Sequence, residues 1–164
     1  MVKLDKLPYA DTSVPVERSQ KLINDMLRAA GAQGIQWSDI YTPKRMAEIK
    51  FVRLDRVFKL SVPIHTEDIE RERRNIAPAK FDLYIAQRER SMFRAMFHYL
   101  QALLNAEKHG LMSFEEAFVG HLNVYLPSGE QTTVSEAVIH RHMEPGRALP
   151  EKCGEPLREV TEAF

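Results

Sequence analysis

The chain is short of the residues on which several common kinds of site depend. Its 164 residues include a single cysteine, Cys153, which excludes an internal disulfide and a cysteine-based zinc site. Its seven glycines form neither a glycine-rich phosphate loop nor a GxSxG motif. No apolar run approaches the length of about 18 residues that a membrane-spanning helix needs. These absences predict a cytoplasmic protein that makes no membrane contact, binds no cofactor and carries no recognisable catalytic constellation.

The formal net charge of the chain is zero, but the charged residues are unevenly distributed along it. The 23 basic and 23 acidic residues cancel, yet residues 44–94 hold thirteen basic and eight acidic side chains. Residues 113–164 hold four basic and nine acidic ones. A basic segment of this kind is compatible with an anionic partner. The favoured interpretation is that the two segments pack on each other or on a neighbouring subunit.

Apolar periodicity predicts one α+β domain over residues 1–143, followed by a tail over 144–164 that contains proline and glycine. Alternation with a period of two indicates antiparallel strands joined by a tight turn near Leu54 and Asp55. Two capping boxes, Ser113 to Glu116 and Thr133 to Glu136, mark helix starts. The expected elements are an N-terminal helix (16–30), a three-stranded antiparallel sheet (35–41, 45–53 and 56–64), a long central helix (81–108) and a C-terminal helix–strand–helix unit.

The long central helix is unusually apolar. Its polar residues between Met92 and Asn105 recur at steps of three and four, so they form one narrow stripe on an apolar cylinder. We therefore expect this helix to be packed on most of its circumference. The residues of the stripe are Arg94, His98, Gln101 and Asn105.

The hairpin of the second and third strands is the strongest candidate for a binding site. Its outer face is expected to be basic, and further arginines follow it in a charged connection. Cations that neutralise phosphates are typical of nucleic-acid binding, as are aromatic side chains that stack on bases. Trp37, Phe51 and Phe58, however, fall on the alternating apolar face, which places them in the core. The residues predicted to contact nucleic acid are Lys44, Arg45, Lys50, Arg53, Arg56, Lys59, Arg71, Arg73 and Arg74.

The histidines offer weaker candidates. His140 and His142 point about 200° apart on a helix and cannot share a metal ion while that helix is intact. His65, with Glu67 and Asp68, lacks the second spaced pair of ligands that a metal site needs, so no metal is expected.

His98, on the long helix, is a candidate for a catalytic role. His98 could act as a general base paired with Glu115 or Glu116. The favoured interpretation is instead a hydrogen-bonded histidine within the polar stripe, because an unpartnered polar group there would cost about 1–3 kcal/mol.

Four stretches of the chain resemble a known group of proteins. They are VPVERSQ, FVRLDRVFKLSVPI, RSMFRAMFHYLQALLNAEKHGLMSFEEAF and PSGEQTTVSE. Over roughly residues 9–139 this pattern is similar to small conserved proteins encoded by bacteriophages, prophages and related mobile elements. That group has no established biochemical activity, so the resemblance assigns no catalytic residue. It implies a bacterial or phage-infected cell, where handling nucleic acid is a common task.

Together these observations predict a non-enzymatic binding protein that contacts DNA or RNA through the basic hairpin. The alternative is a protein-interaction or assembly module without nucleic-acid contact. In that case the acidic C-terminal segment would bind a protein partner or a second copy of the chain.

Overall fold

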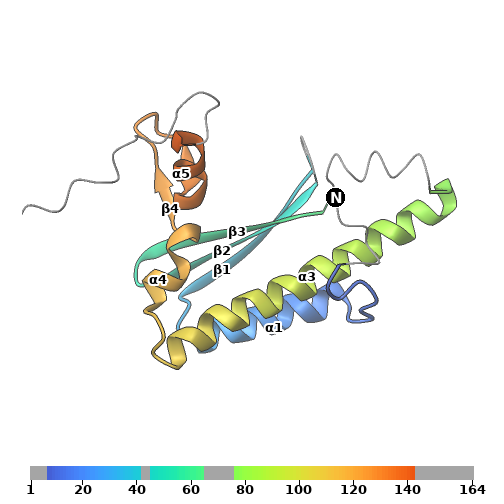
Figure 1. The fold of residues 1–164 in the computed structure, drawn as a ribbon, viewed down its shortest axis with the longest axis horizontal. Coiled ribbons are helices and arrows are strands. Elements are labelled where there is room, and N and C mark those ends of the chain that lie inside the picture. The colour runs from blue at the N-terminus through green and yellow to red at the C-terminus, as the bar shows by residue number, and fades with distance from the viewer. Residues whose placement is uncertain (1–6, 42–44, 65–75, 143–164) are drawn as a thin grey trace, which may run out of the picture.

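The computed structural model describes residues 7–41, 45–64 and 76–142 and confirms the α+β architecture (Figure 1). Of the helices in these ranges, none combines the length and apolar character required to cross a membrane. In chain order the elements are α1 (Val16–Ala29), β1 (Gly34–Ile40), β2 (Met46–Arg53), β3 (Arg56–Pro63), α3 (Pro78–Lys108), α4 (Phe114–Phe118), the 3-10 helix η2 (Val119–His121), β4 (Asn123–Tyr125), β5 (Gln131–Thr133) and α5 (Val134–His142).

The main sheet is antiparallel in the order β1-β2-β3, and α1 and α3 lie together on one of its faces (Figure 1). Alternate residues of β2 are buried on this helix-facing side, as the period of two predicts. Phe51 pairs with Phe58, and Ile49 pairs with Leu60, so one apolar face runs across both strands. The core of the domain therefore lies between this face and the two helices.

The predicted tight turn between β2 and β3 is confirmed. Leu54 and Asp55 have φ angles of 53° and 57°, and they follow and precede the directly paired Arg53 and Arg56. Positive φ at both central residues is the geometry of a type I′ hairpin turn, which glycine and asparagine adopt more readily than leucine. The turn fixes the register of the hairpin, and with it the face on which each cation lies.

Both capping boxes are also confirmed. The backbone N–H of Glu116 donates to Ser113 Oγ at 3.2 Å, and the Ser113 N–H donates to the Glu116 carboxylate at 2.7 Å. Thr133 and Glu136 exchange equivalent bonds of 3.0 and 3.2 Å at the start of α5. Each box satisfies N–H groups that a helix start leaves without intrahelical partners.

The C-terminal unit contains two strands where the sequence predicted one. β4 and β5 form a small antiparallel hairpin that follows α4 and η2. An isolated bridge between Phe58 and Leu122 joins this unit to β3. The aromatic rings of Phe114 and Phe118 then pack edge-on against Phe51 and Phe58. This cluster attaches the C-terminal unit to the main sheet.

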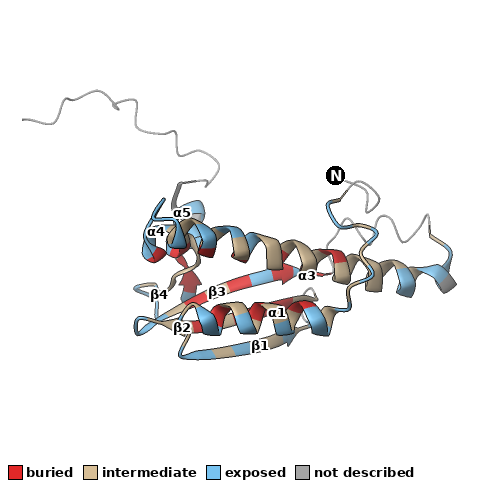
Figure 2. Ribbon diagram, turned by 90° about the horizontal axis from the view of Figure 1, so that it is seen from below, coloured by how far each residue is buried: buried red, intermediate tan, exposed pale blue. Residues whose placement is uncertain are grey.

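Helix α3 begins at Pro78, three residues earlier than expected, and ends as predicted at Lys108. Its fully buried apolar side chains face the sheet and α1, and they are Phe93, Met96, Leu100 and Leu104. The expectation that α3 is packed on most of its circumference is confirmed over residues 85–104, where only Tyr99 and Ala102 are exposed. The N-terminal turns of the helix are more exposed (Figure 2).

Ser19 is expected to reduce the stability of the core. It lies on the buried side of α1 with 0% exposure, and its hydroxyl has no hydrogen-bond partner among the described residues. We expect Ser19→Ala to raise the free energy of unfolding by about 1 kcal/mol, because the substitution removes a buried unsatisfied polar group. Denaturant unfolding measures this change. Ser135→Ala in α5 reports the helix-propensity part alone, and an equal gain from both variants would contradict the burial argument.

Candidate functional site

Two of the predicted nucleic-acid-binding arginines lie on the helix-facing side of the sheet. Arg45 and Arg53 flank the apolar residues of β2 and each reaches a carboxylate of α3. Arg45 donates to Glu89 at 3.2 Å. Arg53 donates two hydrogen bonds to Glu107, of 2.6 and 2.9 Å, and its guanidinium lies 3.8 Å from the centroid of the Phe114 ring. Both side chains therefore hold the sheet to α3.

Two predicted lysines lie on the opposite face of the sheet. Lys50 pairs directly with Lys59 across β2 and β3, and the carboxylate of Glu48 lies 3.1 Å from Lys50 Nζ and 3.8 Å from Lys59 Nζ. Glu48 is only 7% exposed. Lys59 Nζ also lies 3.8 Å from Glu136 of α5. This chain of alternating charges links the sheet to the C-terminal unit.

The basic hairpin is thus not a single basic face. Arg53 and Arg56 share the helix-facing side, and Lys50 and Lys59 share the other, so the expected basic outer face does not hold all four cations. Arg56 is exposed at the turn and makes no ion pair with a described residue. The remaining predicted residues lie outside the described ranges and are Lys44, Arg71, Arg73 and Arg74.

The aromatic part of the nucleic-acid pattern mostly belongs to the core, as expected. Phe51 and Phe58 are 1% and 2% exposed. The indole Nε1 of Trp37 donates to Asn24 Oδ1 of α1 at 2.9 Å, and its ring packs against Phe93. These rings are therefore not free to stack on bases.

His98 makes a polar contact within the stripe, as the favoured interpretation predicted. Its Nδ1 lies 3.3 Å from Gln101 Oε1, and its ring stacks on Tyr9 with the centroids 4.8 Å apart. The carboxylate of Glu116 is held in its capping box. The side chains of His140 and His142 and all of His65 lie outside the described set. Among the residues that the structure describes, no cluster of three or more His, Cys, Asp or Glu side chains could hold a metal ion.

A different histidine, His121 of η2, is partly buried. His121 Nε2 lies 2.7 Å from the hydroxyl of Tyr99 on α3, and the imidazole is hydrogen-bonded to the backbone of Lys59. Burial lowers the pKa of His121, and the bond to Lys59 partly opposes this shift. Burial likewise raises the pKa of Tyr99. No local pattern predicts this pair, because its members are 22 residues apart.

Acid is expected to destabilise the protein in two stages. As the pH falls below about 6.5, His121 takes up a proton in the unfolded chain more readily than in the folded one, so the free energy of unfolding decreases. Hydrogen bonding from the Thr133 backbone lowers the pKa of Glu136, so the stability that this carboxylate contributes is present above about pH 4.5 and is lost below it.

Thermal unfolding between about pH 8 and pH 4 measures both stages. His121→Gln should remove the first stage and leave the second. His109→Gln, at an exposed position just after α3, is the matched control. A wild-type melting temperature that stays constant between pH 7 and pH 5 would contradict the role of His121.

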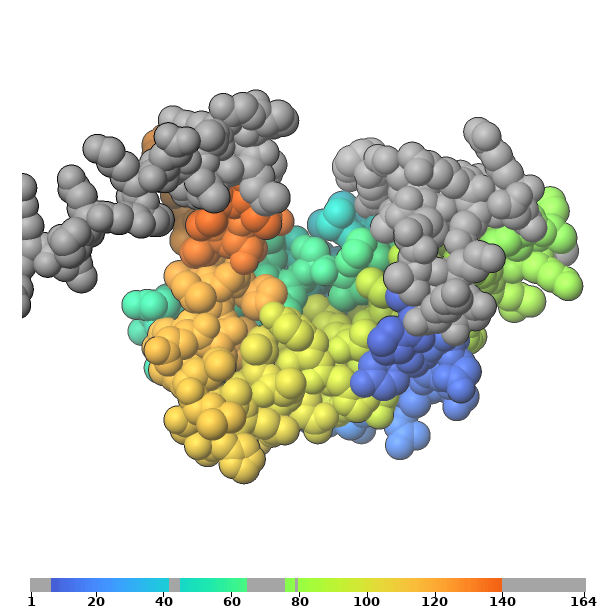
Figure 3. All heavy atoms as spheres, viewed as in Figure 1, coloured from blue at the N-terminus to red at the C-terminus, as the bar shows by residue number. Residues whose placement is uncertain are grey.

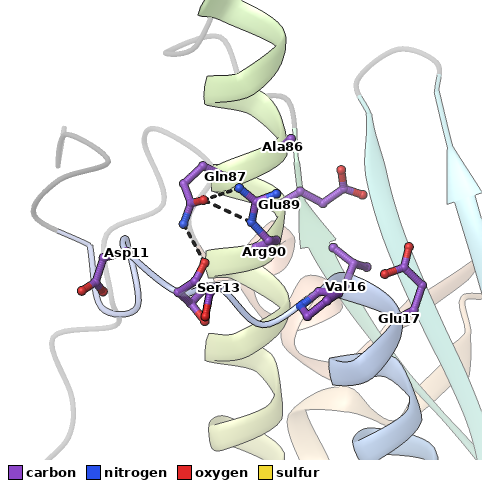
Figure 4. Close-up of a pocket in the computed structure, with 10 residues that line it drawn as sticks. Asp11, Ser13, Val16, Glu17, Ala86, Gln87, Glu89 and Arg90 are labelled. Carbon is purple, nitrogen blue, oxygen red and sulfur yellow. Dashed lines mark hydrogen bonds between the residues drawn. The ribbon is translucent and has the colours of Figure 1, made fainter.

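One hollow, of about 510 Å³, lies between the segment before α1 and the N-terminal half of α3 (Figure 4). Gln87 donates to the carbonyls of Ala10 and Thr12 at 2.7 and 3.0 Å, and Arg90 donates to the Gln87 side-chain oxygen. These bonds hold the N-terminal segment against α3.

The surface of α3 offers a further candidate that the sequence reasoning missed. One stripe of this helix carries two exposed residues, although Met92 at its edge packs against the hydrophobic core. In Figure 3, part of α3, in yellow, reaches the surface between α4 and the N-terminal residues. Tyr99 is 46% exposed there, Ala102 is exposed, and the rest of the stripe is half-buried. We call it the open stripe of α3, and its residues are Arg88, Met92, Ala95, Tyr99, Ala102 and Ala106.

Comparison of the chain with protein-family models, with curated proteins and with solved structures found no match.

Proposed function

We propose that the protein is a non-enzymatic assembly module that binds another protein through the open stripe of α3. The observation that carries this proposal is the exposure of Tyr99 and Ala102 on the open stripe of a helix that is otherwise largely covered in its central part. A helix with so few polar residues favours cover on most of its surface. A protein partner would remove the remaining apolar surface from water.

The basic residues support this choice. Arg45, Arg53, Lys50 and Lys59 all engage carboxylates within the domain. Cations already paired in this way gain less from a phosphate, because the internal pair must first be broken. Among the described hairpin residues, Arg56 keeps an unpaired exposed charge. Nucleic-acid binding stays a prediction, as does the phage or mobile-element setting.

Site-specific photo-crosslinking inside cells tests the proposal. A photo-reactive amino acid at position 102 lies on the open stripe, whereas the same group at exposed position 105 lies on the polar stripe of the same helix. We expect a discrete protein adduct from position 102 and none from position 105. Equal labelling from both positions, adducts to nucleic acid, or the absence of a protein adduct at position 102 would contradict the proposal.

A further inference from the structure

The hydroxyl of Tyr99 on α3 lies against an imidazole. Tyr99 is 46% exposed, and its Oη lies 2.7 Å from Nε2 of His121 in η2. The imidazole is also hydrogen-bonded to the backbone of Lys59 in β3. A hydroxyl, a base within hydrogen-bond reach and a third group that orients the base form the arrangement by which proteins activate hydroxyl nucleophiles. The three residues therefore have the geometry of a reactive site.

The hydrogen bonds of His121 determine which ring nitrogen can take a proton. Burial lowers the pKa of His121, so the ring is largely neutral at pH 7, and the bond to the Lys59 backbone partly opposes this shift. A bond that raises the pKa of a histidine is one in which the ring donates an N–H, here to the carbonyl oxygen of Lys59. Because Nε2 faces Tyr99, the donor is Nδ1. Nε2 of the neutral ring is then an acceptor for the Tyr99 hydroxyl.

Tyr99 depends on this neighbour to lose its proton. Burial raises the pKa of Tyr99 above its ordinary value, so almost no phenolate forms at neutral pH. Transfer of the proton to His121 during a reaction avoids the free phenolate. A tyrosine without a neighbouring base has no such route, however exposed it is.

The electrophile that suits this pair carries no charge at its reacting atom. Phosphoryl transfer requires cations beside the charged oxygens of the phosphate. The ammonium of Lys59 lies 3.8 Å from the carboxylates of Glu48 and Glu136, so its charge is already paired. The carbonyl carbon of a thioester brings no such charge to the site. The chemical class that fits is therefore an activated acyl group.

We infer that Tyr99 accepts acyl groups and that His121 is its general base. The oxygen of Tyr99 attacks the carbonyl carbon of a thioester while its proton moves to Nε2 of His121. The bond between that carbon and the sulfur then breaks. The sulfur leaves with the electron pair and takes the proton from His121, and Tyr99 remains as an ester. The inference goes beyond the assembly function and does not rest on it, because the reaction takes place on a chain whose open stripe is uncovered.

N-acetylimidazole, a reagent that acetylates tyrosine hydroxyls, tests the inference on the purified full chain. Mass spectrometry should show that Tyr99 reacts about 10-fold faster than Tyr125, a modest gain for general-base catalysis. Tyr125 is the matched control, because it is 71% exposed and its hydroxyl accepts a hydrogen bond from Gln131 at 2.6 Å. The amide of Gln131 cannot take a proton from the tyrosine. A rate at Tyr99 equal to or below that at Tyr125 would overturn the inference.

The pH dependence of the two rates separates the effect of the base from that of exposure. An unassisted tyrosine reacts as its phenolate, so the rate at Tyr125 should fall about tenfold between pH 8 and pH 7. The rate at Tyr99 should change by less than about twofold, because His121 is largely neutral at both values. Both tyrosines are in one sample, so the pH dependence of the reagent cancels. A fall at Tyr99 as large as that at Tyr125 would show that Tyr99 reacts without His121.

Replacement of His121 by glutamine removes the base and keeps a hydrogen-bonding side chain beside Tyr99. His121→Gln should lower the rate at Tyr99 to that at Tyr125, whereas His109→Gln, at an exposed position, should leave both rates unchanged. Circular dichroism verifies that the variants are folded. An unchanged rate at Tyr99 in folded His121→Gln would contradict the role of the imidazole. The pH comparison uses the wild-type chain, so it decides the question even if this variant unfolds.

Discussion

Replacing Arg53 with alanine is expected to lower the free energy of unfolding by about 3 kcal/mol. The guanidinium makes two hydrogen bonds to Glu107 and lies over the Phe114 ring, so it joins β2, α3 and α4. The two charged side chains are only 18% and 24% exposed, so solvent screens their interaction incompletely. Loss of the arginine leaves a largely buried carboxylate unpaired and also removes a cation–π contact.

Arg56 provides the matched control, because it is the direct cross-strand partner of Arg53 and is exposed. Arg56→Ala should change the free energy of unfolding by less than about 0.5 kcal/mol. Denaturant unfolding of both variants measures the difference. Similar values for the two would show that the Arg53–Glu107 pair contributes little. The same two variants help to interpret any measurement of nucleic-acid binding. Weaker binding by Arg53→Ala would reflect loss of structure, whereas weaker binding by Arg56→Ala would indicate that Arg56 contacts the nucleic acid.

Replacing Phe118 with alanine is expected to cost about 4 kcal/mol. Phe118 is fully buried, and its ring contacts Phe51, Phe58 and Phe114 at centroid distances of 4.5 to 6.0 Å. Truncation removes the aromatic contacts that join the C-terminal unit to the sheet, and the cavity left behind adds to the cost. The loss should be large enough to bring a domain of this size close to its unfolding threshold.

Val119, the next residue, is 52% exposed and serves as the control. Val119→Ala should change the free energy of unfolding by less than about 0.5 kcal/mol. Limited proteolysis gives a second measurement, since Phe118→Ala should speed cleavage after residue 118 more than cleavage within α1. A loss below about 1 kcal/mol, or uniform acceleration of cleavage, would contradict the role of the cluster.

Local signals in the sequence predicted the elements of the fold well. The alternation of β2 and β3, the reciprocal pairs of the two capping boxes and the turn at Leu54 and Asp55 each depend on residues a few positions apart. Such patterns report backbone geometry directly. The second short strand of the C-terminal unit was missed because Gln131–Thr133 is too brief to show a period.

The candidate site was harder to predict, because it depends on contacts between distant segments. The side on which Arg53 and Lys50 lie follows from the register of the hairpin, and their carboxylate partners could not be inferred from spacing. Arg53 and Glu107 are 54 residues apart. The exposure of Tyr99 and Ala102 on α3 could not be predicted either, because the helix is apolar on most of its circumference and its sequence does not show which part is left uncovered.

The assembly proposal is tested by measuring how accessible the open stripe is in cells. Hydroxyl-radical footprinting of the protein in cells, compared with the dilute purified chain, measures it at Met92 and Tyr99. Both residues should be protected in cells, while the exposed Tyr41 and Tyr125 should be modified equally in the two samples. Modification of Tyr99 to the same extent in cells and in dilute solution would contradict the claim that this face of α3 is an assembly surface.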